Sequence, residues 1–344
     1  MVALAVMASG MVTALGFNAP ATLAALRAGI SGIQETPWMD HGSGARLYGA
    51  KVPLPHWWEG VGNLANLISP AIYECLQAST HHSPESIPLL LGVAAPERPG
   101  RFLCLDEDLI SEVQIRLGLP QHPLSKIFPM DQTGCALALI EAHELIRRAQ
   151  VKRVIVAGVD SFLHQPTLNV YIEQRRIVTP NNSNGFFPGE AGCAVLIGEA
   201  GTHNRDELCI HGYGVAHESA NINGTEPLRA KGLTDAIKKA LDNTGVALKD
   251  IAYRLTDLSG EHYKFKEATF SAGRLNTGER DAALDLWHPI EFLGEIGAAI
   301  LPCLLAQAMH ADHKGYAPGP LALCHVGNDS GSRAAFIVGR NRRG

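Results

Sequence analysis

One stretch near the middle of the chain constrains the fold more than any other: residues 130–161, MDQTGCALALIEAHELIRRAQVKRVIVAGVDS. Residues 135–146 would be apolar on nearly every side of a helix, and a helix without a polar face is expected to be buried. The turn at 131–134 can satisfy the unpaired N–H groups of the helix start. Residues 154–159 follow as a strand covered on both faces. The sequence therefore predicts an interior helix and strand, with Cys135 at the start of the helix.

A similar pattern recurs later in the chain and predicts two related halves. Residues 294–309 (GEIGAAILPCLLAQAM) again begin with small residues and continue as an apolar helix. Residues 321–330 again form a strand that ends in glycine and a polar turn, and the strand expected at 331–339 matches the one expected at 189–198. A chance repetition of common α/β patterning is the alternative explanation.

Polar residues at 198–207 separate the two halves. We therefore expect an N-terminal half at 1–202 and a C-terminal half at 203–344. Because residues 2–7 are apolar and residues 8–10 are small, the N-terminal half should open with a strand followed by a turn at Ala8–Gly10.

Composition and charge narrow the function classes. The 344-residue chain is 46% hydrophobic and 18% charged with a formal net charge of −5, which is typical of a compact globular protein without attraction to nucleic acid or anionic membranes. Its seven cysteines show no paired spacing, which favours a reduced, cytoplasmic protein. No run reaches the length of a membrane span, and no nucleotide, zinc-protease or hydrolase motif occurs. We therefore expect no cofactor, no metal, no nucleic-acid partner and no membrane partner.

Several motifs together resemble the β-ketoacyl-acyl carrier protein synthases, a family of thiolase-fold condensing enzymes. Residues 10–16 (GMVTALG) and 26–33 (LRAGISGI) are similar to the family's G-x-V-(S/T)-x-x-G and L-x-x-G-x-S-G-I, and residues 184–191 (NGFFPGEA) to its D-G-F-x-x-G-E-G. The resemblance covers most of residues 1–200 and is weaker beyond. It implies an α/β, thiolase-like, five-layer α-β-α-β-α fold of two pseudo-repeated halves, usually in a homodimer.

The resemblance also implies the chemistry of the site. In this family a cysteine at a buried helix start takes an acyl group from a carrier, and two histidines stabilise the charge that forms when a malonyl unit loses carbon dioxide. Cys135 is the candidate nucleophile, since a helix N-terminus stabilises a thiolate. Its register stays open: matching Asp131 to the family's motif puts Gly134 at the nucleophile position, and counting back from the strand gives Thr133.

The two histidines of the family are not in their usual motifs. His262 lies near the expected H-G-T turn, and Gly294 stands where the histidine of G-H-x-x-G-A-A belongs. His288, a few residues upstream, is the candidate to replace it. A lone histidine near a strand end is more often a structural residue. In the G-F-G-G-T-N motif near the end of the chain, Asp329 replaces the aromatic residue.

Charged residues near these positions suggest further roles. Glu261 and Glu295 could act as bases if burial raised their pKa, although Glu295 is also well placed to cap the following helix. A set of basic residues follows the central helix and the next loop, and it is either a docking face for an acidic acyl carrier protein or a solvated helix end: Arg147, Arg148, Lys152, Arg153, Arg175 and Arg176.

Two functions stay open. The first is an acyltransferase of fatty-acid or polyketide-type metabolism that takes acyl thioesters from an acyl carrier protein or acyl-CoA, with Cys135 as acyl acceptor and His262 or His288 assisting. The second is a catalytically degenerate partner that resembles a chain length factor. The first suggests a homodimer and the second a heterodimer with an active synthase. The thiol at the helix start favours the first function, and Gly294 in place of histidine favours the second.

Overall fold

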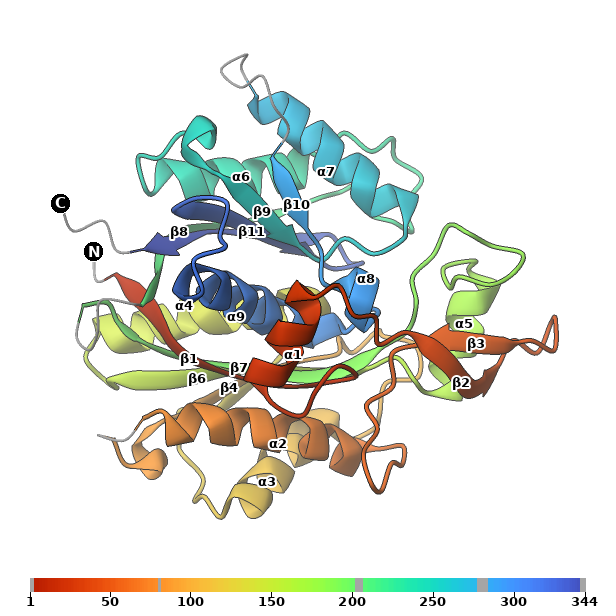
Figure 1. Ribbon diagram of the computed structural model, residues 1–344, viewed down its shortest axis with the longest axis horizontal. Coiled ribbons are helices and arrows are strands. Elements are labelled where there is room, and N and C mark those ends of the chain that lie inside the picture. Colours follow the sequence, from red (N-terminus) through yellow and green to blue (C-terminus); the bar gives the residue numbers. More distant parts are fainter. Residues whose placement is uncertain (1–2, 80–81, 202–206, 277–283, 341–344) are drawn as a thin grey trace.

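Ten of the twelve described strands form two stacked five-stranded sheets. The computed structural model describes residues 3–79, 82–201, 207–276 and 284–340. Within these residues, hydrogen bonds connect ten strands in the order β10-β9-β11-β12-β8-β1-β7-β6-β4-β5. Because β8 meets β1 over only three residue pairs, the ladder divides there into two sheets with a layer of helices between them (Figure 1).

The two sheets repeat one topology. The first contains β1 (Leu4–Thr13), β4 (Leu89–Val93), β5 (Lys126–Pro129), β6 (Arg153–Ser161) and β7 (Glu190–Glu199). The second contains β8 (Leu208–His217), β9 (Tyr253–Thr256), β10 (Asp285–Trp287), β11 (Leu321–Gly327) and β12 (Ser332–Arg340). From the shared edge outward, the first sheet runs β1-β7-β6-β4-β5 and the second β8-β12-β11-β9-β10. Residues 202 and 203, where we expect the halves to divide, lie outside the described residues.

Helices complete five alternating layers. The outer face of the first sheet is covered by α2 (Val61–Gln77) and α3 (Leu105–Leu117), and that of the second by α6 (Lys231–Asp242) and α7 (His262–Leu275) (Figure 1). The layer between the sheets holds α4 (Gly134–Arg147), α9 (Ile300–His313) and α1 (Ala19–Arg27). Short 3-10 turns, η2 (Asp131–Thr133) and η4 (Gly297–Ala299), precede α4 and α9, whereas η1 (Pro84–Ser86) and η3 (Leu248–Asp250) lie in connections.

The remaining elements extend one end of the molecule or close the middle layer. The hairpin of β2 (Gln34–Met39) and β3 (Arg46–Gly49) projects beside α5 (Gln165–Glu173), and α8 (Ile290–Leu293) precedes η4 (Figure 1). No helix in the described ranges combines the length and apolar character that a membrane span needs.

The middle layer contains the largest apolar cluster. A sheet lies on each side of α4 and α9, so these helices bury apolar side chains in two directions, as the all-round apolar sequence predicts. Burial in this cluster extends from Leu4 and Val6 of β1 to Phe336 and Val338 of β12. A single core therefore joins the two sheets.

The first strand is longer than the sequence analysis expects. The predicted turn at Ala8–Gly10 is wrong, because β1 continues through these residues to Thr13. A Cβ atom at Gly10 would overlap the backbone carbonyl of Ala71 in α2. The glycine therefore lets the helix lie directly on the strand, a close approach that the sequence pattern does not distinguish from a turn.

Candidate functional site

The start of α4 is held by an ion pair rather than by a helix cap. Asp131 adopts a left-handed backbone conformation with φ of 48°, and no side chain of η2 caps the helix. Its carboxylate accepts a hydrogen bond from the backbone N–H of Ala95 at 2.9 Å and pairs with the buried guanidinium of Arg98. The capping role predicted for this turn is therefore wrong: the charge of Arg98 recruits Asp131.

The thiol of Cys135 is sealed inside the molecule. Cys135 is fully buried, and its Sγ donates a hydrogen bond to the carbonyl oxygen of Ala298 at 3.3 Å. Glycines of β4 and β6 pack against it: a Cβ at Gly92 would lie 2.6 Å from Sγ and one at Gly158 2.8 Å from it. Burial raises the pKa of the thiol to about 12 and outweighs the expected effect of the helix N-terminus. The thiol is therefore protonated at neutral pH.

The structure does not bring the other predicted catalytic residues to this thiol. His262 is the first residue of α7, with an exposed side chain, and its backbone N–H donates to Asn184 Oδ1 at 2.8 Å. His288 follows β10 and meets the Phe265 ring edge-on, with ring centroids 5.9 Å apart. Cys135, His262 and His288 thus occupy three separate environments. The geometry gives no support to their acting as one catalytic set.

The alternative nucleophile positions are also enclosed. Thr133 is buried, and its hydroxyl donates to the carbonyl oxygen of Met130 at 2.9 Å. Gly134 has no side chain to offer. Neither Thr133 nor Gly134 therefore presents an accessible nucleophilic side chain.

Gln132 is the side chain that extends from the helix start toward the second half. Its Nε2 donates to Glu295 Oε1 at 3.3 Å, and the same oxygen accepts from the backbone N–H of Gly297 at 2.9 Å. Glu295 therefore accepts from the first N–H of η4, but no side chain caps η4 or α9, so the helix cap that one of the two interpretations expects is not formed. Its other oxygen lies 3.4 Å from Lys264 Nζ, which is also 3.3 Å from Asp257 Oδ2.

These contacts determine the charge states. Burial raises the pKa of Glu295, although Lys264 opposes the shift. Burial alone would lower the pKa of Lys264, but the carboxylates of Asp257 and Glu295 raise it, so the ammonium stays charged. No sequence motif indicates a role for Gln132 or Lys264 in this site. The only sequence feature that points to Gln132 is its position: a long polar side chain in the turn that leads directly into a buried helix.

Two arginines bridge further pairs of carboxylates. Arg98 lies 3.1 Å from Asp160 Oδ2, in addition to its bond with Asp131. Arg176 donates from Nε to Glu261 at 2.7 Å and from Nη2 to Asp329 at 3.1 Å. Asp329 therefore serves as a counter-ion for Arg176.

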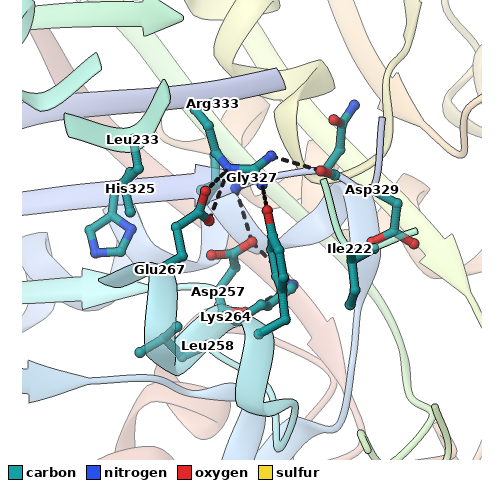
Figure 2. A pocket seen from close by; sticks show the side chains of 13 residues that line it. Ile222, Leu233, Asp257, Leu258, Lys264, Glu267, His325, Gly327, Asp329 and Arg333 are labelled. Atoms are coloured by element: carbon teal, nitrogen blue, oxygen red, sulfur yellow. Dashed lines mark hydrogen bonds and ion pairs between the residues drawn. The ribbon is translucent and has the colours of Figure 1, made fainter. Parts of the chain in front are cut away.

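A fourth cation completes this region (Figure 2). Arg333 donates to Glu267 at 2.8 Å and to the Tyr263 hydroxyl at 3.0 Å. His325 lies close by in β11, and burial lowers its pKa to about 4, so its imidazole is neutral at pH 7. The space among these side chains is about 20 Å³, which is room for one water.

We call the whole set the polar centre. It consists of four cations, seven carboxylates and one amide, contributed by both halves of the chain: Arg98, Arg176, Lys264, Arg333, Asp131, Asp160, Asp257, Glu261, Glu267, Glu295, Asp329 and Gln132. Every cation in it is paired with a carboxylate. The carboxylates outnumber the cations, and burial raises the pKa of Asp160, Glu267 and Glu295. Such a site holds the halves together and presents neither a thiolate nor an imidazolium.

A polar cavity of about 270 Å³ opens beside the polar centre. Arg98, Asp131 and Arg176 line one side of it, and Tyr171 and Asn221 belong to its other walls. Both arginines are already bound to carboxylates, so the cavity has polar walls without an unpaired cation from these two residues.

The predicted basic docking face is only partly at the surface. Arg147 and Arg148 are exposed and pair with Glu144. Arg153 and Arg176 are buried, so they cannot contribute to an exposed patch, and their assignment to it is wrong. Arg153 is buried because it belongs to the interior strand β6. Arg176 is buried because it pairs with the carboxylates of Glu261 and Asp329.

Comparisons with known proteins show the fold. No family model matches the chain, and no curated protein matches its sequence. A chain from the complex of the ketosynthase ApeO with its chain length factor ApeC from Xenorhabdus doucetiae superposes with a TM-score of 0.74 at 15% identity, with 98% of each chain covered. A β-ketoacyl synthase from Burkholderia phymatum STM815 gives 0.74 at 17% identity, covering 99% of this chain and 100% of that one. The ketosynthase domain OzmH KS7 from Streptomyces albus JA3453 gives 0.80 at 12% identity, covering 99% and 75%.

These similarities define the class of fold. The chain has the thiolase-like architecture of the ketosynthases, as the sequence motifs predict. In this chain carboxylates, arginines and a lysine surround the start of α4. Because one fold hosts many activities, the function has to be argued from this site.

Proposed function

We propose that the protein is a non-catalytic partner with the ketosynthase fold, which pairs with an active ketosynthase as a chain length factor does. The observation that carries this proposal is the state of Cys135: its thiol is fully buried, protonated and bonded to Ala298. Acyl transfer to cysteine needs an accessible thiolate with a base or fixed donors nearby. The alternative, an acyltransferase that uses Cys135, would require α4 to separate from Gly92 and Gly158.

Two further features support pairing. The outer edge of β5 is the end of the described ladder, and an open edge strand is a template for a strand of another chain. Two of the similar solved structures are assemblies of a ketosynthase with a chain length factor. The polar cavity beside Arg98 and Asp131 belongs to this chain. It is the part that the chain would contribute to a pocket shared with a ketosynthase.

An acylation assay tests the absence of catalysis. The protein is incubated with malonyl and medium-chain acyl thioesters of an acyl carrier protein and of coenzyme A, and its intact mass is measured. We expect no adduct on Cys135. The exposed Cys104 is the matched control, since adventitious acylation should disappear in Cys104→Ala and persist in Cys135→Ala. An adduct that disappears in Cys135→Ala alone would overturn the proposal in favour of the acyltransferase.

A reconstitution assay tests the partner role. The chain is co-expressed with ketosynthases of its source, and complexes are isolated by a tag on this chain and sized by light scattering. We expect a heterodimer in which the ketosynthase makes its product only when this chain is present. Cys135→Ala should support the same product yield as the wild type. A stable homodimer that binds no ketosynthase would contradict the proposal.

A further inference from the structure

A second cavity lies away from the polar centre, between α1, β10, α8 and α9. The helices α1 and α9 contact each other in the middle layer, and α8 lies beside them (Figure 1). The cavity holds about 270 Å³, and no residue of the polar centre lines it. A cavity of about 150 Å³ is large enough for benzene, so this one can take a substituted ring system. We call it the aromatic cavity.

Flat side chains form its walls. Trp287 and Tyr316 stack with ring centroids 6.0 Å apart and an interplanar angle of 28°, and Tyr253 supports Trp287 from 4.8 Å. The Tyr316 hydroxyl is hydrogen-bonded to His310 Nδ1 at 2.9 Å, which fixes the ring. Walls of this kind are ordered before any ligand arrives and favour a planar aromatic guest.

A buried acceptor without a hydrogen-bond partner in the described chain belongs to a side chain in the wall of the same cavity. Gln307 of α9 lines the aromatic cavity, and its Oε1 is buried without a hydrogen-bond partner in the described chain. Buried amide oxygens are nearly always paired, because an unpaired one is costly. Oε1 is shielded in its present rotamer, so the amide has to rotate toward the cavity before the N–H or O–H group of a ligand can satisfy it.

The cavity lining also contains Glu291 and one cation, Arg27, that has no counter-ion among the described residues. Arg27, the last residue of α1, lies over the Tyr316 ring with its guanidinium carbon 4.4 Å from the centroid. No carboxylate of the described residues forms an ion pair with it. A guanidinium held on an aromatic face binds a carboxylate well, because its N–H edge stays exposed.

We propose that the aromatic cavity binds a small planar aromatic carboxylate that carries a ring N–H or O–H donor. The ring lies against Trp287 and Tyr316, the donor bonds to Gln307 Oε1 once that amide rotates toward the cavity, and the carboxylate pairs with Arg27. The contacts come from α1, α9, β10 and the connection after α9, and they require no change in the polar centre. This inference does not depend on the proposed partner function.

Isothermal titration calorimetry with three matched probes tests the site. Indole-3-acetate carries ring, N–H and carboxylate; benzofuran-3-acetate lacks the N–H; indole-3-acetamide lacks the charge. We expect one molecule of indole-3-acetate per chain, with both other probes at least tenfold weaker. Benzofuran-3-acetate loses the bond to Gln307, and indole-3-acetamide loses the ion pair with Arg27.

Variants assign each contact. Gln307→Leu should make indole-3-acetate and benzofuran-3-acetate bind equally, and Arg27→Gln should make indole-3-acetate and indole-3-acetamide bind equally. Arg148→Gln, an exposed arginine at the end of α4, is the matched control and should leave all three affinities unchanged. The absence of saturable binding of indole-3-acetate at millimolar concentration would overturn the proposal. Equal affinities of the three probes for the wild type would do so as well.

Discussion

The polar centre and the aromatic cavity differ in whether their polar groups are paired with other groups of the chain. In the polar centre, each cation is bound to one or two carboxylates, and the nearby thiol is hydrogen-bonded and enclosed. In the aromatic cavity, the oxygen of Gln307 has no hydrogen-bond partner and Arg27 no counter-ion among the residues that the structure describes. The first region has used its polar groups for folding, and the second has groups left for a ligand. The start of α4, where the sequence motifs predict a nucleophile, is therefore not the region with unused binding groups.

The pairing in the polar centre links the two halves of the chain. Gln132 bonds to Glu295, Arg176 to Asp329, and the carboxylate of Asp160 accepts from the backbone N–H of Ala298 at 3.1 Å. Buried ion pairs add little net stability, but removing one partner leaves an uncompensated charge. The polar centre should therefore be sensitive to substitution and the aromatic cavity tolerant of it.

The largest difference in stability is expected between variants of two arginines, one in each region. Arg98→Met leaves Asp131 and Asp160 buried without their cation and should reduce the free energy of unfolding by about 3–5 kcal/mol. Arg27→Met removes only an exposed cation–π contact and should cost less than about 1 kcal/mol. Urea unfolding of both variants measures the difference. Equal losses of unfolding free energy in the two variants would show that the polar centre is no more sensitive to loss of a cation than the aromatic cavity.

A smaller effect is expected from the neutral imidazole beside the polar centre. Burial lowers the pKa of His325 to about 4, with Arg254 and Arg333 acting in the same direction and Asp257 against it. The unfolded chain therefore binds a proton below pH 6.5 that the folded protein does not, and stability is lost as the pH falls from 6.5 toward 4. This contribution amounts to about 2 kcal/mol at pH 5.

Unfolding curves of the wild type and His325→Gln between pH 7 and pH 5 test this effect. The wild type should lose about 2 kcal/mol more than the variant over this range. Parallel profiles would indicate that the imidazole is solvated in the folded protein.

The smallest effect compares two glutamines. Gln132→Leu removes the donor that Glu295 accepts and should cost about 1 kcal/mol, because Gly297 and Lys264 still satisfy that carboxylate. Gln307→Leu removes an unpaired buried oxygen and should be neutral or stabilising. Thermal unfolding of the two variants provides the comparison, and a loss of stability in Gln307→Leu would mean that its amide is satisfied in solution.

The sequence allows the fold to be predicted because apolar pattern and layer order are linked. A helix apolar on all sides needs a sheet on each side, and the second such helix at 294–309 requires the second sheet. The bounds of α9 differ from that range, since a 3-10 turn at Gly297–Ala299 precedes a helix that extends to His313. The fold can therefore be predicted from hydrophobic patterns even when the predicted ends of a helix are wrong by several residues.

The site does not follow from the sequence in the same way. Some of its contacts join residues more than 130 positions apart, such as Gln132 with Glu295 and Asp160 with Ala298, and no local pattern in the sequence indicates such contacts. The thiol of Cys135 matches the family by its place in a helix, yet glycines in two other strands determine that it is enclosed. Motif similarity therefore locates the region but does not determine its protonation or access.

The interior position of α4 and α9 has a consequence during synthesis. When the ribosome has made α4, the helix has only its own sheet to pack on, because α9 and the second sheet are still missing. One apolar side of the nascent protein stays exposed to water until nearly the last strand has emerged, and it is the surface on which chaperones act. The architecture that seals the thiol so completely in the finished protein thus makes the chain most vulnerable to aggregation before its translation ends.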